Sequence, residues 1–406
     1  MTWAARIPTL GGSRYPLASF VLDFVNNYYR GSGALGSSPS ALPGYTFTRA
    51  STGYAEDTNG NLISFASGVP RITNKGVLIE EARTNLLLQS QDFSNAAWKV
   101  FAGAAKVGLA AITDPAGGGT AYEVSFGTTG GAIASASAVY QDGFSLSNST
   151  AYTLTLYVRA KSGTTSVRLA QTSGGVTTGS SDISVTDTAW TRLSLTVTSA
   201  ASATSPNISL RNNTAGNSGN VYVAFAQLEA GSFPTSYIPT TSSTVTRAAD
   251  VFYYSGLSIS ASTFTIAGGG ISNSTGKGYA GRIATISDVV NGDVLTIAVD
   301  DNQRSGVLSS APGIALQGIN AAPVVSAGQE TIDAVRVSGT SVRGSANASA
   351  PGDATGTYSY SVTLTRLYVG DIVAAIRPMS GYVRRIAIYP FAASDAQLQS
   401  ISSGNF

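Results

Sequence analysis

GVLIEEARTNLLLQSQDFSNAAW, residues Gly76–Trp98, is the stretch around which the rest of the chain is organised. It contains a strand-like apolar run, Val77–Ile79, then an acidic pair with a nearby base, and then a second apolar run, Leu86–Leu88. A polar turn leads from there to the lone Trp98. The residues before this stretch have the composition of an arm, and the pattern after it is typical of two packed β domains.

The composition predicts an ordered β protein with more than one domain. A chain of 406 residues is long enough for two or three domains. Only 11% of the residues are charged, whereas 43% are hydrophobic and 45 are glycine, so the composition is not that of a disordered protein. The net charge of +2 is too small to favour a nucleic acid or an acidic membrane surface as partner.

The absence of two residue types excludes several kinds of chemistry. The chain has no histidine and no cysteine, which rules out Ser-His-Asp and Cys-His catalysis and zinc sites built from these side chains. Disulfides are excluded as well, so stability must come from packing or assembly. No cofactor, metal ion or catalytic residue is expected.

The sequence gives no sign of secretion or of membrane insertion. The first residues, MTWAARIPTLGG, lack the basic start and the long apolar core of a signal peptide. No apolar run approaches the roughly 18 residues that a membrane-spanning helix needs. We therefore expect a protein that is made in the cytoplasm and is not inserted in a membrane.

Residues 1–44 are expected to form an extended arm. Prolines and a Gly/Ser-rich run, residues 31–44, interrupt them, and Phe20–Val25 fits either a short strand or a helical turn. The alternative is a flexible terminus. An ordered arm of this composition needs a partner surface, and tyrosine and arginine are enriched at such interfaces. The candidate anchoring residues are Phe20, Phe24, Tyr28, Tyr29 and Arg30.

From Tyr45 onward the pattern predicts strands. Residues 45–85 are interpreted as a small β collar, in which Asn59-Gly60 predicts a hairpin. Residues 86–243 predict a β-sandwich, because segments such as Val221–Glu229 alternate with period two and turn residues separate them. Strict alternation in that segment places Val223 and Phe225 on one face.

Residues 251–406 predict a second sandwich, which ends in a short helix. Gly381–Tyr389 is the last expected strand, and Ser394 with Gln397 three residues later is typical of a helix N-cap. The expected fold class is therefore all-β: an extended N-terminal arm and a small collar followed by two β-sandwich, or jelly-roll, domains.

Three groups of segments resemble parts of bacteriophage and prophage tail or capsid-associated proteins. Phe47–Gly53, Pro70-Arg71 and Gly76–Leu87 are together similar to an N-terminal module of those proteins. Gln227–Gly231, Ser236–Thr240 and Thr246–Asp250 are similar to the closing segment of their carbohydrate-binding-module-like jelly roll. Gly381–Tyr389 with Ser394–Leu398 resembles the end of a concanavalin A-like, laminin G-type sandwich.

This resemblance implies a virion component, namely a tail fibre, head fibre, spike or capsid decoration. Its arm would attach to other virion proteins of the capsid or tail, and its sandwiches would project and mediate host attachment. The resemblance also implies a homotrimer, although no coiled-coil heptads are present. The alternatives are a receptor-binding lectin for a host cell-surface polysaccharide and, less favoured by the sequence, a capsule-degrading depolymerase.

Aromatic side chains are the candidate glycan-binding residues. They are Trp98, Tyr140 and Trp190 in the first sandwich and Tyr358 and Tyr360 in the second. The alternative for each is a place in the core of the sandwich, where a lone tryptophan is often found.

Charged side chains near the opening stretch are expected to have a structural role. Alternation places Glu81 and Arg83 on one side, and Arg49 and Arg71 could join them in an ion-pair network because arginine satisfies several acceptors. The alternative is that Glu80 and Glu81 form a catalytic acid pair, but alternation sends these two side chains to opposite faces. In the second sandwich, no strand of residues 251–406 places two acids on one face, as a retaining glycosidase would need. Asp114 and the group Asp300-Asp301-Asn302 lack the ligand spacing of a calcium loop.

Overall fold

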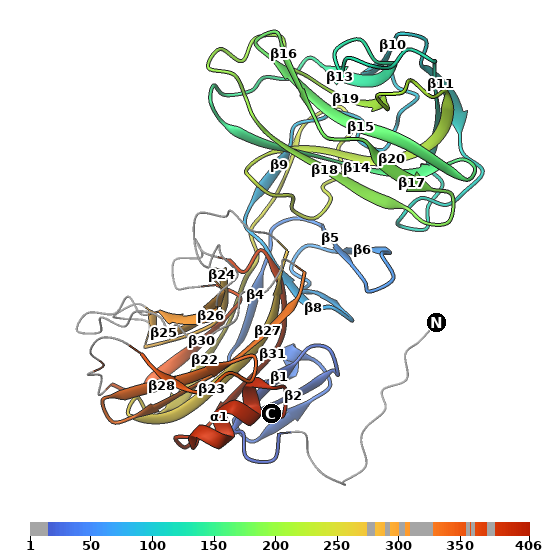
Figure 1. Ribbon diagram of the computed structural model, residues 1–406. Helices are drawn as coiled ribbons and strands as arrows, with labels where there is room; N and C mark the ends of the chain where they lie inside the picture. Colours follow the sequence, from blue (N-terminus) through green and yellow to red (C-terminus); the bar gives the residue numbers. More distant parts are fainter. Residues whose placement is uncertain are drawn as a thin grey trace. The chain divides into compact units, whose positions relative to one another are not determined.

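The computed structural model describes residues 15–273, 281–288, 293–299, 305–308, 328–354, 358, 362–371 and 378–406. The chain forms two compact units (Figure 1). Unit 1 comprises Met1–Phe47, Asn74–Ile79 and Val251–Phe406, and unit 2 comprises Thr48–Thr73 and Glu80–Asp250. The opening stretch therefore contributes its first strand to unit 1 and its remainder, from Glu80, to unit 2.

Unit 2 is a sandwich of two antiparallel sheets with two short accessory strand pairs. One sheet has the order β10-β13-β19-β15-β16 with β17 also on β15, and the other has the order β11-β12-β20-β14-β18. The strands are β5 (Gly53–Glu56), β6 (Leu62–Phe65), β7 (Arg71–Thr73), β9 (Arg83–Asn85), β10 (Trp98–Phe101), β11 (Ala105–Leu109), β12 (Tyr122–Phe126), β13 (Ala138–Asp142), β14 (Ala151–Ala160), β15 (Thr164–Ser173), β16 (Val176–Gly179), β17 (Ile183–Thr186), β18 (Thr191–Thr198), β19 (Asn207–Asn212), β20 (Gly219–Ala230) and β21 (Val245–Arg247).

The core of unit 2 lies between its two sheets and follows the alternation of the sequence. One buried cluster contains residues from both sheets: Leu154, Leu156 and Val158 in β14, and Val167 and Leu169 in β15. Burial of such side chains contributes about 1.5–3 kcal/mol each, which is the main source of stability in a chain without disulfides.

A β-bulge in β20 corrects one detail of the expected alternation. Val221 and Val223 point into the core, but Phe225 has a positive φ of 55°, and the register with β14 shifts between Thr155 and Tyr157. The extra residue turns Phe225 to the opposite face, where it stacks on Tyr237 at 4.7 Å between ring centroids. Val223 and Phe225 therefore lie on different faces.

Unit 1 contains two antiparallel sheets and one helix. One sheet has the order β29-β28-β27-β23-β31-β1-β2-β3 with β8 also on β31, and the other has the order β26-β25-β24-β30-β22-β4. The elements are β1 (Phe20–Asp23), β2 (Tyr28–Gly31), β3 (Ala34–Gly36), the 3-10 helix η1 (Pro39–Ala41), β4 (Tyr45–Thr48), β8 (Gly76–Ile79), β22 (Val251–Ile259), β23 (Thr263–Ser272), β24 (Gly281–Ser287), β25 (Asp293–Val299), β26 (Ser305–Leu308), β27 (Glu330–Ser338), β28 (Ser341–Ala346), β29 (Gly352–Asp353), β30 (Leu364–Val369), β31 (Gly381–Tyr389) and α1 (Asp395–Ser402).

The expectation of an extended arm needs correction for residues 15–44, whereas residues 1–14 lie outside the described residues. β1 pairs antiparallel with the last strand, β31, and all four of its residues are buried. Phe20 packs edge-on against Tyr254 at 5.1 Å, and Phe24 packs against Phe252 at 5.9 Å between centroids. The apolar residues that suggested an anchor are thus used by the sheet, because a strand with two apolar faces is most stable when both faces are covered.

The other three candidate anchoring residues also belong to unit 1. Tyr29 is buried next to Phe24, and Tyr28 stacks on Tyr15 at 5.8 Å. Arg30 donates from Nη2 to the carbonyl oxygen of Tyr15 at 2.7 Å. These side chains stabilise the first hairpin of the fold.

The residues expected to form a separate collar are divided between the two units. Residues 45–47 and 74–79 belong to unit 1, and residues 48–73 and 80–85 belong to unit 2. The hairpin predicted at Asn59-Gly60 is present, since β5 and β6 pair around a loop in which Asp57 accepts hydrogen bonds from the amides of Asn59 and Asn61.

The expected all-β fold class is confirmed. Of the described residues, none lies in a helix that is long and apolar enough to cross a membrane.

Candidate functional site

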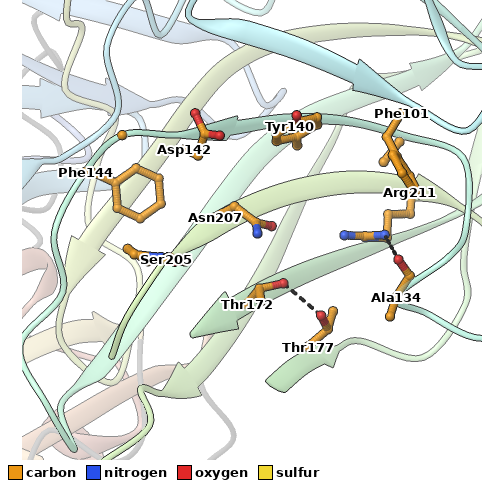
Figure 2. A pocket seen from close by; sticks show the side chains of 13 residues that line it. Phe101, Ala134, Tyr140, Asp142, Phe144, Thr172, Thr177, Ser205, Asn207 and Arg211 are labelled. Atoms are coloured by element: carbon orange, nitrogen blue, oxygen red, sulfur yellow. Dashed lines mark hydrogen bonds between the residues drawn. The ribbon is translucent and has the colours of Figure 1, made fainter. Parts of the chain in front are cut away.

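The outer face of one unit 2 sheet carries an open groove. Its volume is about 820 Å³. Strands β10, β13, β19, β15 and β16 form its floor and walls, and the side chains that line it point into it from several of these strands (Figure 2). The lining residues are Phe101, Ala134, Ala138, Tyr140, Asp142, Gly143, Phe144, Thr172, Thr177, Ser205, Pro206, Asn207 and Arg211.

Period-two alternation explains which side chains of β13 reach the groove. Val139 points inward to the core, and Gln141 is buried, where its side chain bonds both the amide and the carbonyl of Leu88. Tyr140 and Asp142 therefore point outward and line the groove. One strand thus places an aromatic ring and a carboxylate two residues apart on the same surface.

The aromatic side chains give the groove apolar surfaces. Phe101, the last residue of β10, is 49% exposed. Tyr140 is half-buried on the neighbouring strand, and Phe144 follows the end of that strand. Exposed rings are costly in water, so a row of them on one concave surface suits a ligand with apolar faces.

The polar side chains of the groove are already ordered. The Thr172 and Thr177 hydroxyls lie 2.8 Å apart, and the Asp142 carboxylate accepts from Lys99 Nζ at 2.6 Å (Figure 2 shows the threonine pair). Arg211 enters from β19 with its guanidinium held by the Ala134 carbonyl at 3.3 Å. The groove therefore offers hydroxyl, carboxylate, amide and guanidinium groups beside its rings.

Of the five predicted glycan-binding residues, the structure places Tyr140 in the groove. Trp98 is buried in the core, stacks on Phe93 at 4.4 Å and donates from Nε1 to the Gln89 carbonyl at 3.0 Å. Trp190 packs against a different cluster of unit 2 and donates from its indole to the Thr113 carbonyl at 3.0 Å. Trp98 therefore has a structural role, and neither of these two rings lines the groove.

The two candidates in the second sandwich do not add to the groove. Tyr358, in unit 1, is buried, and its hydroxyl donates to the Ala261 carbonyl at 2.6 Å. Tyr360 lies outside the described residues.

The sequence reasoning missed Phe101, Phe144, Asn207 and Arg211. The sequence indicates which residues of a strand point outward, but it does not indicate the order of the strands in the sheet. That order brings the four residues to one surface.

A buried charge network is the second feature of unit 2. Arg71 donates from Nη1 to Glu80 Oε2 at 2.7 Å and also pairs with Asp250. Arg49 donates to Asp250 Oδ1 at 3.1 Å, and Arg247 Nη2 lies 3.4 Å from Glu80 Oε2. All five side chains are nearly inaccessible to solvent.

Electrostatics keep the Glu80 carboxylate of this network ionised. Burial alone would raise the pKa of Glu80, but Arg247 and Arg71 outweigh it and lower that pKa from 4.5 to about 2. The Ser236 amide and hydroxyl also donate to the Glu80 carboxylate, at 2.8 and 2.6 Å. Both oxygens of the Glu80 carboxylate therefore have donors, and the network stabilises the fold.

The observed ion pairs differ from the predicted network of Arg49, Arg71, Glu81 and Arg83 in the acids that take part. Arg49 and Arg71 share Asp250, and the glutamate partner of Arg71 is Glu80. Glu81 and Arg83 form a separate, partly exposed pair at 2.7 Å. Neighbouring residues of an extended segment point to opposite sides, which separates Glu80 from Glu81.

The described residues offer no obvious metal site. They contain no group of three or more carboxylates that could hold an ion. The Asp114 carboxylate accepts from the amides of Ala116, Gly118 and Thr120, so it orders its own loop. Residues 300–302 lie outside the described residues.

No protein-family model and no curated protein matches the sequence. Solved structures that are similar include carbohydrate-binding modules and a phage tailspike domain. The tandem CBM22-1–CBM22-2 domain of a Paenibacillus barcinonensis xylanase is 10% identical, with 77% of this chain and 97% of that chain covered and a TM-score of 0.30. The CBM22-1 and GH10 modules of Clostridium thermocellum xylanase 10B, complexed with xylohexaose, are 13% identical over 37% of this chain, with a TM-score of 0.27.

The tailspike structure is the enzymatically active domain of tailspike protein 4 of bacteriophage CBA120. It is 11% identical over 36% of this chain, with a TM-score of 0.26. The chain spans 28% of the xylanase structure and 21% of the tailspike structure. At TM-scores this low the likeness carries no argument about function, which must come from the residues of this chain.

Proposed function

We propose that unit 2 is a glycan-binding module that holds a segment of polysaccharide in its groove. The observation that supports this most is the row of rings on a concave polar surface, with Phe101 and Tyr140 on adjacent strands. A pyranose ring has an apolar face that packs on an aromatic ring and hydroxyl groups at its rim. Asn207, Asp142 and the threonine pair are positioned to hydrogen bond such hydroxyls.

The proposed role is binding without bond cleavage. Glycoside hydrolysis ordinarily requires two carboxyl groups, one on each side of the scissile bond. Among the residues that line the groove, Asp142 carries the one carboxylate, and Lys99 pairs with it. We therefore expect no new reducing ends when the protein is incubated with a polysaccharide that it binds.

The test is a glycan array followed by calorimetry with the full chain. Tyr140→Ala should weaken binding about tenfold, because the loss of one stacked ring removes more than 1 kcal/mol. Tyr222→Ala is the matched control, since Tyr222 is a half-buried tyrosine of β20 in the other sheet. Lack of binding by the unmodified protein to every glycan, or equal effects of the two substitutions, would contradict the proposal.

We also propose that the chain is a structural component of a bacteriophage virion that attaches to capsid or tail proteins and forms a homotrimer. The resemblance of its segments supports this, and those segments have a physical role in the fold. Arg49, Arg71, Glu80 and Asp250, which form the buried charge network, all lie within them. The similarity therefore involves the residues that hold unit 2 together.

Mass spectrometry of purified phage particles and light scattering of the isolated protein test this second proposal. The chain should be found in the particle, and its mass in solution should be three times 41.3 kDa. Absence from the particle would contradict the virion assignment, and a monomer would contradict the trimer.

A further inference from the structure

One cation in the groove, Arg211, has no carboxylate partner among the residues that the structure describes. Arg211 is 6% exposed and lines the groove beside Phe101 and Ala134 (Figure 2). Its Nε donates to Ser209 Oγ at 2.8 Å, and its Nη1 makes long bonds of 3.3 and 3.5 Å to the carbonyls of Ala134 and Ala136. Over the described parts of the chain, none of the ion pairs involves Arg211.

A second arginine makes this arrangement electrostatically unfavourable. Arg168 on β15 lies directly opposite Arg211 in the strand register and is also 6% exposed. Arg168 has an acidic partner, Asp182, at 3.3 Å. Asp182 therefore neutralises Arg168 alone, and Arg211 faces a like charge at the directly opposed strand position, where like charges repel each other.

The consequences of this arrangement are visible at Arg211 itself. Burial and the nearby Arg168 both lower the pKa of Arg211. A nearly buried cation without a counter-ion reduces the stability of the free protein, and an anionic ligand would remove that penalty on binding. The groove is open, so a ligand can reach this position.

We propose that Arg211 binds the carboxylate of an acidic sugar, so that the groove takes a polysaccharide that contains uronic acid residues. This inference rests on the proposed glycan-binding function. A guanidinium presents two parallel N–H donors that match the two oxygens of a carboxylate. Tyr140 and Asn207 line the same groove, where they can contact the sugar ring and its hydroxyls.

Pairs of polysaccharides that differ in one group test the proposal. Galacturonan, glucuronan and mannuronan are each titrated into the full chain beside their carboxyl-reduced forms, in which a CH₂OH group replaces the carboxylate. At least one acidic polymer should bind at least about tenfold more tightly than its reduced form. That difference should decrease as salt is raised, because ions screen the attraction.

Two arginine variants locate the effect. Arg211→Gln should abolish the preference for the acidic polymer and leave the melting temperature unchanged or higher, because the repulsion with Arg168 is relieved. Arg159→Gln is the control, since Arg159 lies on β14 in the other sheet and donates to the Asp187 carbonyl. It should leave the preference unchanged.

The outcomes separate this inference from the proposed function. If no acidic or neutral polysaccharide binds, including xylan, glucan and mannan, both are overturned. If neutral polymers bind as tightly as acidic ones, or Arg211→Gln keeps the preference, glycan binding stands and the uronate assignment is wrong. If dextran sulfate competes equally well, charge alone is sensed and the carboxylate assignment is also wrong.

Discussion

Arg71 shows, at the scale of one residue, why each buried charge of unit 2 is stable only when its partners are present. Its guanidinium is fully buried and contacts Glu80, Asp250, the Ser236 hydroxyl and the Tyr54 carbonyl. Each buried charge loses its hydration, and the attraction to its partners repays this only when the geometry is good. The loss of any one member leaves an uncompensated charge, so these residues stabilise one specific arrangement of their segments.

Glu80 leads to a prediction about acid stability. Its pKa falls from 4.5 to about 2 on folding, which corresponds to about 3 kcal/mol of folding free energy at neutral pH. Because the folded pKa is the lower one, this contribution is complete above about pH 4.5 and is lost as the pH falls to about 2. Denaturant unfolding followed by the fluorescence of Trp98 and Trp190 should show this loss of stability. In Glu80→Gln, stability should be lower at neutral pH and should fall less between pH 5 and 2; an unchanged pH profile would contradict the prediction.

At the scale of elements, local rules hold where an element depends on its own residues. The helix α1 begins with a capping box, in which Ser394 Oγ accepts from the Gln397 amide and Gln397 Oε1 accepts from the Ser394 amide. In β20 the local rule fails at Phe225, because packing against Tyr237 requires a bulge. Alternation is a property of one strand, whereas the position of a bulge depends on what packs against the two faces of that strand.

The capping box of α1 gives a prediction at this scale. Ser394→Ala should destabilise the helix by about 1 kcal/mol, because the Gln397 amide loses its acceptor. Hydrogen exchange of the peptide 390–406 should then be about fivefold faster. Ser400→Ala, an exposed serine inside the same helix, should slow exchange or leave it unchanged, since alanine has the higher helix propensity.

At the scale of the whole molecule, the units are assembled from segments that are far apart in the sequence. Unit 1 takes its first strands from the beginning of the chain and its last from the end, as β1 and β31 show. In unit 2 the Asn85 amide donates to the carbonyls of Ala226 and Ile238 at 3.0 and 2.8 Å. A domain cut out at boundaries taken from the strand pattern would lose such contacts.

Two fragments of different length test whether unit 2 needs the segments outside its sandwich strands. A fragment of residues 48–250 contains all of unit 2, whereas a fragment of residues 86–243 contains its sandwich strands without Asn85 and without the charge network. The shorter fragment should be less stable by several kcal/mol, because each buried carbonyl left unpaired costs about 1–3 kcal/mol. Thermal melts of the two fragments measure the difference, and equal melting temperatures would contradict the prediction.

The sequence by itself determined the all-β class, the strands with strong alternation, the terminal helix and the absence of histidine and cysteine chemistry. These properties depend on neighbouring residues or on composition, so a linear pattern contains them. Only the tertiary structure decided that Tyr140 lines a groove while Trp98 lies in the core, that Glu80 rather than Glu81 joins Arg71, and that Phe20 belongs to a sheet rather than an arm. Each of these depends on which distant strand lies alongside, and strand pairing is set by packing over the whole unit rather than by any local pattern.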